Sequence, residues 1–83
     1  MFSEGFLTTN GNTYEWGVVY HKKPNPYCIR GGNVEWIAVA DKDGLVVRVD
    51  NWAFDLPQDD ALRDLVKALI ERFEWEARNE KGH

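Results

Sequence analysis

The sequence predicts an α+β fold, in which a four-stranded antiparallel sheet (β-β-β-β-α order) is packed on one face by a C-terminal amphipathic helix. Short apolar runs separated by turn signals fill the first fifty residues, a pattern typical of antiparallel strands. Apolar side chains over residues 57–78 instead recur with a helical period. A single helix covers only one face of a sheet, so we expect the opposite face to be open. The 83 residues are expected to form one domain, with residues 79–83 as a flexible tail.

The first hairpin is expected to join strands over residues 6–9 and 13–20 through Asn10-Gly11-Asn12. Asn-Gly is a strong signal for a tight turn because both residues adopt positive φ angles at low cost. Alternate residues of a strand share one face, and the large side chains on one face of the second strand are Tyr14, Trp16, Val18 and Tyr20. We expect Trp16 to lie in the core.

Residues 21–33 are expected to form a loop, because two prolines and a Gly-Gly pair disfavour regular structure there. A loop of this length in a compact domain is often functional. We expect Ile29 or Tyr27 to anchor it to the core. Cys28 is expected to be a small buried hydrophobic residue and not a nucleophile, since no motif pairs it with a base.

The second hairpin is expected to join strands over residues 34–40 and 45–50 through Asp41-Lys42-Asp43-Gly44. A three-residue loop with a bulge would pair Asp41 with Leu45. This register places Ile37, Val39, Val47 and Val49 on one face and Trp36, Ala38, Ala40, Val46 and Arg48 on the other. A two-residue turn would move Trp36 to the opposite face, because a one-residue slip inverts a strand. Both registers leave apolar side chains on both faces.

The helix is expected over residues 57–78, with Asp55 as its N-terminal cap and Gln58 three residues later. Its apolar stripe consists of Leu62, Leu65, Val66, Leu69, Ile70, Phe73 and Ala77. We expect Phe73 to lie in the core. Trp75 falls outside the stripe, so we expect it to be partly exposed and available to a partner.

The chain is acidic, with 10 lysine and arginine residues against 14 aspartate and glutamate residues. The excess lies in residues 34–83, which hold seven basic and twelve acidic residues. This balance argues against binding to a nucleic-acid backbone, which requires clustered lysine and arginine. Two interpretations stay open: the net charge keeps the protein soluble, or it complements a protein partner with a basic surface.

The sequence shows no signal peptide and no apolar run of the roughly 20 residues that span a bilayer. We therefore expect a cytoplasmic protein without membrane association. The single cysteine excludes an internal disulfide.

No motif predicts catalysis, a cofactor or a bound metal. Asp41-Lys42-Asp43-Gly44 is similar to the start of a calcium-binding loop, but Trp52 occupies the position where that loop needs a bidentate glutamate. Gly31-Gly32-Asn33 leads into an expected strand instead of a helix, which is the wrong order for binding phosphate at a helix end. We expect a protein that is not an enzyme.

The expected function is protein binding through the open sheet face, the loop over residues 21–33 or the flank of the helix. Aromatic and arginine side chains dominate binding hot spots, and carboxylates complement a basic partner. The expected contact residues are Tyr20, Tyr27, Trp36, Asp41, Asp43, Arg48, Glu71, Glu74 and Trp75.

The small size, acidity and aromatic content are similar in type to those of phage- or plasmid-encoded inhibitors of bacterial defence complexes, such as anti-CRISPR proteins. This likeness implies a larger partner complex with a basic surface. Carboxylates such as those of Asp41, Asp43, Glu71 and Glu74 would then occupy a nucleic-acid groove of the partner.

Two alternatives stay open. The chain would be a homodimeric structural or assembly subunit if the uncovered sheet face or an edge strand contacts a second copy. It would bind single-stranded nucleic acid or a small ligand weakly if the loop near residues 20–30 is the site, since Tyr20 and Tyr27 flank Lys22 and Lys23 there.

Overall fold

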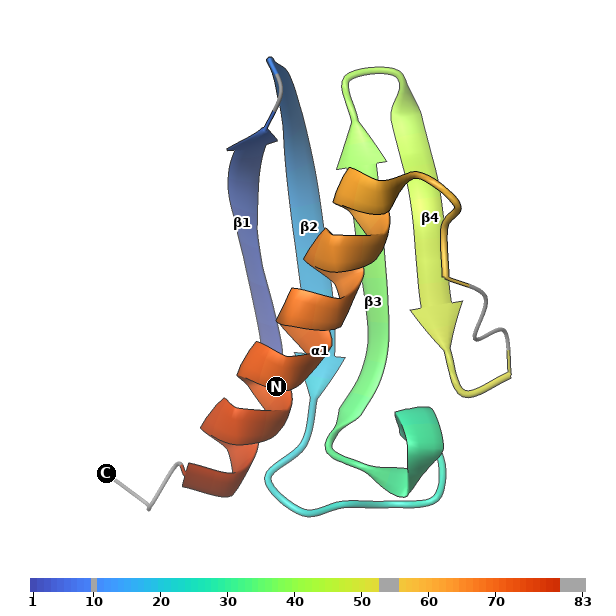
Figure 1. Cartoon of the computed structure of the whole chain (residues 1–83). Helices are drawn as coiled ribbons and strands as arrows, with labels where there is room; N and C mark the ends of the chain where they lie inside the picture. The colour runs from blue at the N-terminus through green and yellow to red at the C-terminus, as the bar shows by residue number, and fades with distance from the viewer. Residues whose placement is uncertain (10, 53–55, 80–83) are drawn as a thin grey trace.

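The computed structural model shows one open sheet of four antiparallel strands with a helix packed on one face (Figure 1). It describes residues 1–9, 11–52 and 56–79, without the side chains of residues 45 and 46. The strands pair in sequence order, and this arrangement confirms the predicted α+β fold. The elements are β1 (Phe2–Thr9), β2 (Asn12–Tyr20), the 3-10 turn η1 (Ile29–Gly31), β3 (Val34–Asp41), β4 (Gly44–Asp50) and α1 (Asp60–Asn79).

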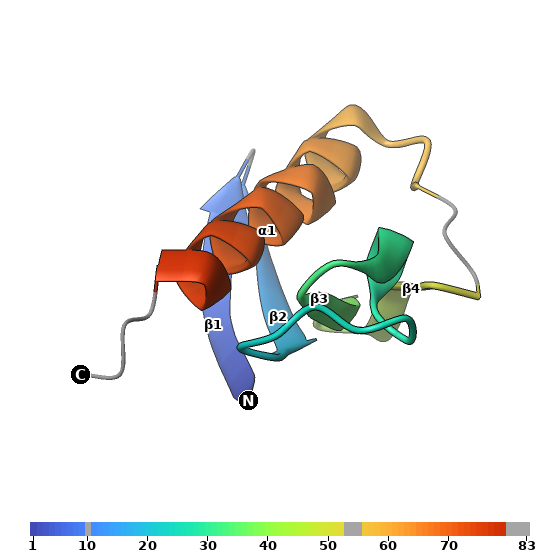
Figure 2. The ribbon, with the colours of Figure 1, turned by 90° about the horizontal axis from the view of Figure 1, so that it is seen from below.

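The core lies between α1 and the two central strands. Figures 1 and 2 show α1 running obliquely over β2 and β3. Phe73 of α1 is almost fully buried, and its ring centroid lies 5.7 Å from that of Trp16 and 5.0 Å from that of Tyr20. The predicted core positions of Trp16 and Phe73 are therefore confirmed. The buried residues of the helix are Leu62, Leu65, Val66, Leu69, Phe73 and Ala77.

The helix begins three residues later than predicted, at Asp60. The Asp59 carboxylate accepts the backbone N–H of Leu62 at 3.0 Å, which is the bond that an N-terminal cap makes. Asp55, the predicted cap, lies outside the described residues. The helix also continues one residue beyond the prediction, to Asn79, whose side chain donates to the carbonyl oxygen of Trp75 at 2.8 Å. The rest of the predicted tail, residues 80–83, is not described.

Of the two registers considered for the hairpin of β3 and β4, the structure has the faces of the first, but with a different turn. Ile37 pairs with Val49 and Val39 with Val47, as expected. Asp41, however, pairs with Gly44 instead of Leu45, and a bulge next to Ala40 restores the register. Because of the bulge, the hairpin has a two-residue turn, yet its side chains lie on the faces that were expected for a three-residue loop.

β1 is longer than predicted and starts at Phe2 instead of Phe6. It pairs with β2 along its whole length, from Phe2 opposite Val19 to Thr9 opposite Asn12. Gly5 fits under the Trp16 indole, because a Cβ atom at this position would lie 2.6 Å from the Trp16 ring. The predicted tight turn between these strands includes Asn10, which lies outside the described residues.

Candidate binding surface on the uncovered sheet face

Within the described chain, no helix or strand covers the sheet face opposite α1 (Figure 2). Side chains alternate between the two faces along each strand, and those opposite the core form what we name the uncovered face. Its large or charged members are Phe2, Glu4, Phe6, Glu15, Val19, Glu35, Trp36, Arg48 and Asp50.

Aromatic rings and a guanidinium group form a row across this face. Phe6 is 73% exposed and Phe2 is 56% exposed. The Phe2 ring lies over Gly17, where an added Cβ atom would approach it to 3.1 Å. Its centroid is 6.2 Å from the Trp36 ring, and the Arg48 guanidinium carbon is 4.9 Å from the Trp36 ring centroid on the other side. The row therefore extends from β1 to β4.

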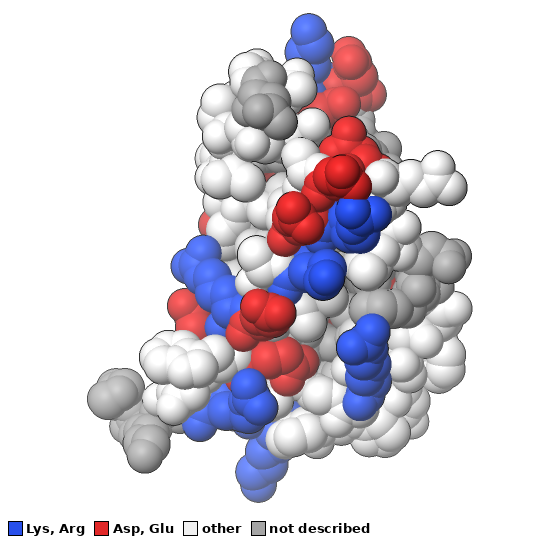
Figure 3. All heavy atoms as spheres, in the orientation of Figure 1, with Lys and Arg blue, Asp and Glu red and all other residues white. Residues whose placement is uncertain are grey.

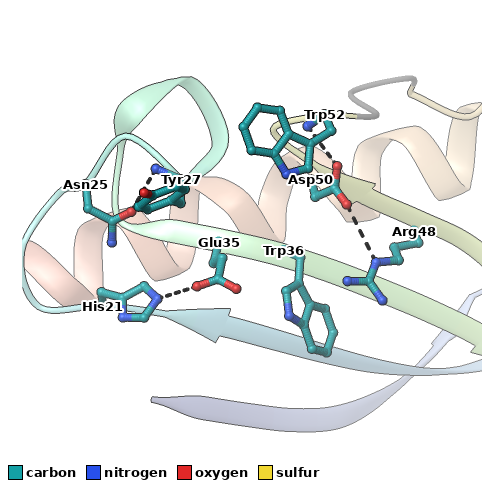
Figure 4. A pocket seen from close by; sticks show the side chains of 8 residues that line it. All are labelled: His21, Asn25, Tyr27, Glu35, Trp36, Arg48, Asp50 and Trp52. Carbon is teal, nitrogen blue, oxygen red and sulfur yellow. Dashed lines mark hydrogen bonds and ion pairs between the residues drawn. The ribbon is translucent and has the colours of Figure 1, made fainter.

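A hollow of about 450 Å³ lies at one end of the uncovered face, and we name it the aromatic groove (Figure 4). Three parts of the chain contribute to it: the loop after β2, the start of β3, and the end of β4 with the segment that follows. Tyr27 and Trp52 are its most exposed rings, with Trp52 79% exposed. The lining residues are His21, Asn25, Tyr27, Glu35, Trp36, Arg48, Asp50 and Trp52.

A β-bulge explains why two consecutive residues of β3 line the groove. Val19 pairs with Trp36, but the next residue, Tyr20, pairs with Val34. Glu35 is therefore the extra residue of the bulge, and its side chain points to the same face as that of Trp36. In Figure 4, His21 approaches this carboxylate, and its Nε2 atom lies 2.7 Å from Glu35 Oε1.

Hydrogen bonds connect the two sides of the groove. The Asn51 side chain donates to the carbonyl oxygen of Pro26 at 3.3 Å and accepts the backbone N–H of Arg30 at 3.3 Å. The loop is thereby linked to the end of β4. On the β4 side, the Trp52 backbone N–H donates to Asp50 Oδ1 at 2.8 Å, and Arg48 Nε lies 3.8 Å from Asp50 Oδ2.

The loop that borders the groove is fixed to the core and to α1. Ile29 is buried whereas Tyr27 is exposed. Of the two residues expected to anchor the loop to the core, Ile29 is therefore the one that does so. The Glu74 carboxylate accepts the backbone N–H groups of Asn33 and Val34, with the shortest distance to each being 2.8 Å. Cys28 is fully buried, as predicted, and burial raises the pKa of its thiol.

The predicted contact residues lie in several separate places. Tyr27, Trp36 and Arg48 meet in the aromatic groove. Asp41 and Asp43 lie in the turn between β3 and β4, where the Asp43 backbone N–H donates to Asp41 Oδ1 at 2.7 Å. The structure therefore does not assemble the nine predicted residues into a single site.

The other predicted residues belong to α1 and the strand beneath it. Trp75 is 61% exposed, as expected, and lies beside Tyr20 in a shallow hollow on the flank of the helix. Glu71 is exposed, but the Glu74 carboxylate is engaged by the loop backbone. Figure 3 shows the helix side of the molecule, where acidic side chains gather over the start of α1 and acidic and basic side chains are interspersed farther along.

Several residues of this surface were not predicted from the sequence. Phe2 lies before the expected first strand, and Phe6 is its first residue. A sequence signal was present, because Phe2, Glu4 and Phe6 recur with the two-residue period of a strand that has one exposed face. Trp52 lies two residues after the end of the last strand, which is the only sequence signal for its place at the rim. The His21–Glu35 pair depends on the β3 bulge, and no local sequence pattern indicates it.

Neither a metal centre nor a membrane span emerges from the part of the chain that the structure describes. No three His, Cys, Asp or Glu side chains within it gather as metal ligands would. None of its helices is both long enough and apolar enough to cross a bilayer. No protein-family model, curated protein or solved structure matched the chain.

Proposed function

We propose that this chain is a non-enzymatic protein-binding domain that docks a basic partner surface on its uncovered face. The observation that carries the proposal is the group of aromatic side chains, exposed at Phe2 and Phe6 and half-buried at Trp36, on a sheet face that no described helix or strand covers. Phe6, Phe2 and Trp36 are large, and water contact with such rings is unfavourable. Exposed apolar patches of this kind mark interaction sites on small proteins, and aromatic and arginine residues dominate hot spots.

The charges of the uncovered face favour a basic partner. Its described strand residues include one guanidinium group, that of Arg48, and four carboxylates. The carboxylates are those of Glu4, Glu15, Glu35 and Asp50. A basic protein surface complements this charge and associates with it faster. A second copy laid face to face would bring like charges together, and nucleic-acid phosphates would meet the same repulsion.

The same charge supports a more specific form of the proposal. An acidic aromatic face would occupy the nucleic-acid groove of a larger complex, as expected for an anti-CRISPR-like inhibitor of a bacterial defence complex. This form predicts that the protein and the partner's nucleic acid compete for binding. A partner that binds this chain and its nucleic acid independently would contradict it.

The proposal is tested with a partner captured from a bacterial lysate, identified by mass spectrometry and then purified. Calorimetric titration compares the original chain with Phe6→Ser, which removes an exposed ring without opening the core. We expect the affinity to fall about tenfold or more, the loss typical of a hot-spot aromatic residue.

Trp75→Ala is the matched control, because it removes an exposed aromatic ring from the helix flank instead of the uncovered face. We expect it to leave the affinity unchanged. The proposal is wrong if Phe6→Ser binds as tightly as the original chain. It is also wrong if light scattering shows a stable dimer that Phe6→Ser dissociates, because a second copy would then occupy the face.

A further inference from the structure

We propose that the aromatic groove receives the guanidinium group of an arginine side chain on the basic partner. This inference rests on the proposed function and identifies the chemical group that the groove recognises. It is carried by the juxtaposition of exposed rings and carboxylates in one hollow at the end of the uncovered face.

The rings of the groove provide surfaces on which a flat cation stacks. Tyr27 and Trp52 are both mostly exposed, whereas Trp36 is half-buried at the centre of the aromatic row. In Figure 4, Tyr27 and Trp52 lie on one side of Glu35, and His21 and Trp36 lie on the other. A cation over the face of tryptophan or tyrosine is attracted by the ring quadrupole.

Two carboxylates complete a site for a cation that also donates hydrogen bonds. Glu35 and Asp50 belong to neighbouring strands, because Trp36 pairs with Asp50, and both side chains line the groove. His21 holds Glu35 in place by the 2.7 Å contact from its Nε2 atom. A guanidinium group donates several hydrogen bonds in one plane, and those to carboxylates are strong.

Within the molecule, Arg48 already places a guanidinium group beside an aromatic ring and a carboxylate of the groove. Its guanidinium carbon lies 4.9 Å from the Trp36 ring centroid, and its Nε atom lies 3.8 Å from Asp50. Among the lining residues that the structure describes, Arg48 is the only arginine or lysine, and it lies with two carboxylates, those of Glu35 and Asp50. A second guanidinium would extend the same arrangement toward Trp52 and Tyr27.

The exposed rings of the groove favour arginine over lysine. Trp52 is 79% exposed, so its ring is accessible to a flat group that stacks on it. A guanidinium group is more weakly hydrated than an ammonium group and stacks flat on aromatic rings. A nucleotide would also stack on these rings, but its phosphate would meet Glu35 and Asp50.

The test is a titration of the isotopically labelled protein with N-acetylarginine amide, followed by the indole N–H resonances of its tryptophan residues. We expect the resonances of Trp36 and Trp52 to shift and those of Trp16 and Trp75 to stay in place. N-acetylcitrulline amide has nearly the same shape without the charge, and we expect it to cause no shift.

Two variants identify the groups responsible. Trp52→Ala removes a ring, and Glu35→Gln removes a charge while keeping an oxygen that accepts a hydrogen bond from His21. We expect each to weaken the binding of N-acetylarginine amide about threefold or more, the loss typical of one exposed cation contact. Glu15→Gln is the matched control, because it removes the same charge from the uncovered face outside the groove.

Three results would overturn the inference. The first is that N-acetylcitrulline amide shifts the Trp36 and Trp52 resonances as strongly as N-acetylarginine amide does. The second is that adenosine monophosphate shifts them more strongly than N-acetylarginine amide. The third is that neither the Trp36 nor the Trp52 indole responds to N-acetylarginine amide. The proposed function fails separately, because Phe6 lies outside the groove. If Phe6→Ser weakens partner binding but Trp52→Ala does not, the docking face stands and the arginine site is wrong.

Discussion

Glu74 joins the helix to the loop beside the groove through a single side chain. Its carboxylate accepts the backbone N–H groups of Asn33 and Val34, so its removal leaves two donors without their acceptor. We expect Glu74→Ala to lower the free energy of unfolding by about 2 kcal/mol. Urea denaturation followed by tryptophan fluorescence measures this change.

Glu71→Ala is the control for the Glu74 variant. Glu71 lies one turn earlier on the exposed side of α1, and exposed substitutions of this kind change stability by less than about 0.5 kcal/mol. Equal stability of the two variants would show that the bonds of Glu74 contribute nothing to the fold.

Cys28 is fully buried, and burial raises the pKa of its thiol. Only the thiolate reacts with iodoacetamide, so we expect the folded protein to react far more slowly at pH 8 than the urea-unfolded chain. As the pH rises, the unfolded chain loses this proton before the folded protein does. Stability is therefore expected to fall as the pH passes above the ordinary thiol pKa.

Mass spectrometry of the alkylated product follows the reaction over time. Equal rates for the folded and unfolded chains at pH 8 would mean that the thiol is accessible in the folded protein.

The core residues were predictable because a repeating pattern places them. Trp16 follows the two-residue period of β2 and Phe73 the helical period of α1, and both are buried. Glu74 was predicted as a contact for a partner, yet its side chain reaches a loop 41 residues earlier in the chain. Such a contact depends on how the helix crosses the sheet, which no local pattern encodes.

At the scale of the elements, the start of α1 depends on Asp59. Its carboxylate accepts the Leu62 N–H at 3.0 Å, and loss of such a cap typically costs about 1 kcal/mol. We expect Asp59→Ala to lower the thermal midpoint measured by circular dichroism. Gln58→Ala, an exposed position just before the cap, is expected to leave the midpoint unchanged, and an equal effect of both would contradict this role.

The hairpin of β3 and β4 shows what a sequence pattern can and cannot determine about an element. Alternation correctly predicted that Ile37 and Val39 share one face of the strand, and the structure shows that this face is the buried one. The turn was predicted one residue too long, since Asp41-Lys42-Asp43-Gly44 fits two turn types. The bulge next to Ala40 allows the shorter turn without moving side chains to the opposite face, and no distinctive sequence signal indicates it.

At the scale of the whole molecule, the acidic uncovered face predicts a monomer. Face-to-face pairing of two copies would bring the carboxylates of Glu4, Glu15, Glu35 and Asp50 close to their counterparts. We expect light scattering at neutral pH and low salt to give the 9.6 kDa mass of one chain. A mass that doubles as the concentration rises would contradict this expectation and favour the homodimer alternative.

The existence of an open face was predictable, but the site on it was only partly so. One helix for four strands indicates an unprotected side, and Tyr27, Trp36 and Arg48 were predicted as contacts and meet there. The sequence could not indicate that Asn51 holds the loop beside β4, which places Tyr27 in the same hollow as Trp52. Nor could composition reveal that Asp41 and Asp43 lie away from the groove.

The order of the elements along the chain affects how the protein emerges during synthesis. Each strand pairs with its neighbour in sequence, so the sheet forms through short loop closures, which cost little entropy. α1 comes last and leaves the ribosome after all four strands. Until then the nascent sheet exposes apolar residues on both sides, and the side destined for the interior is the last to be shielded from chaperones and from other chains.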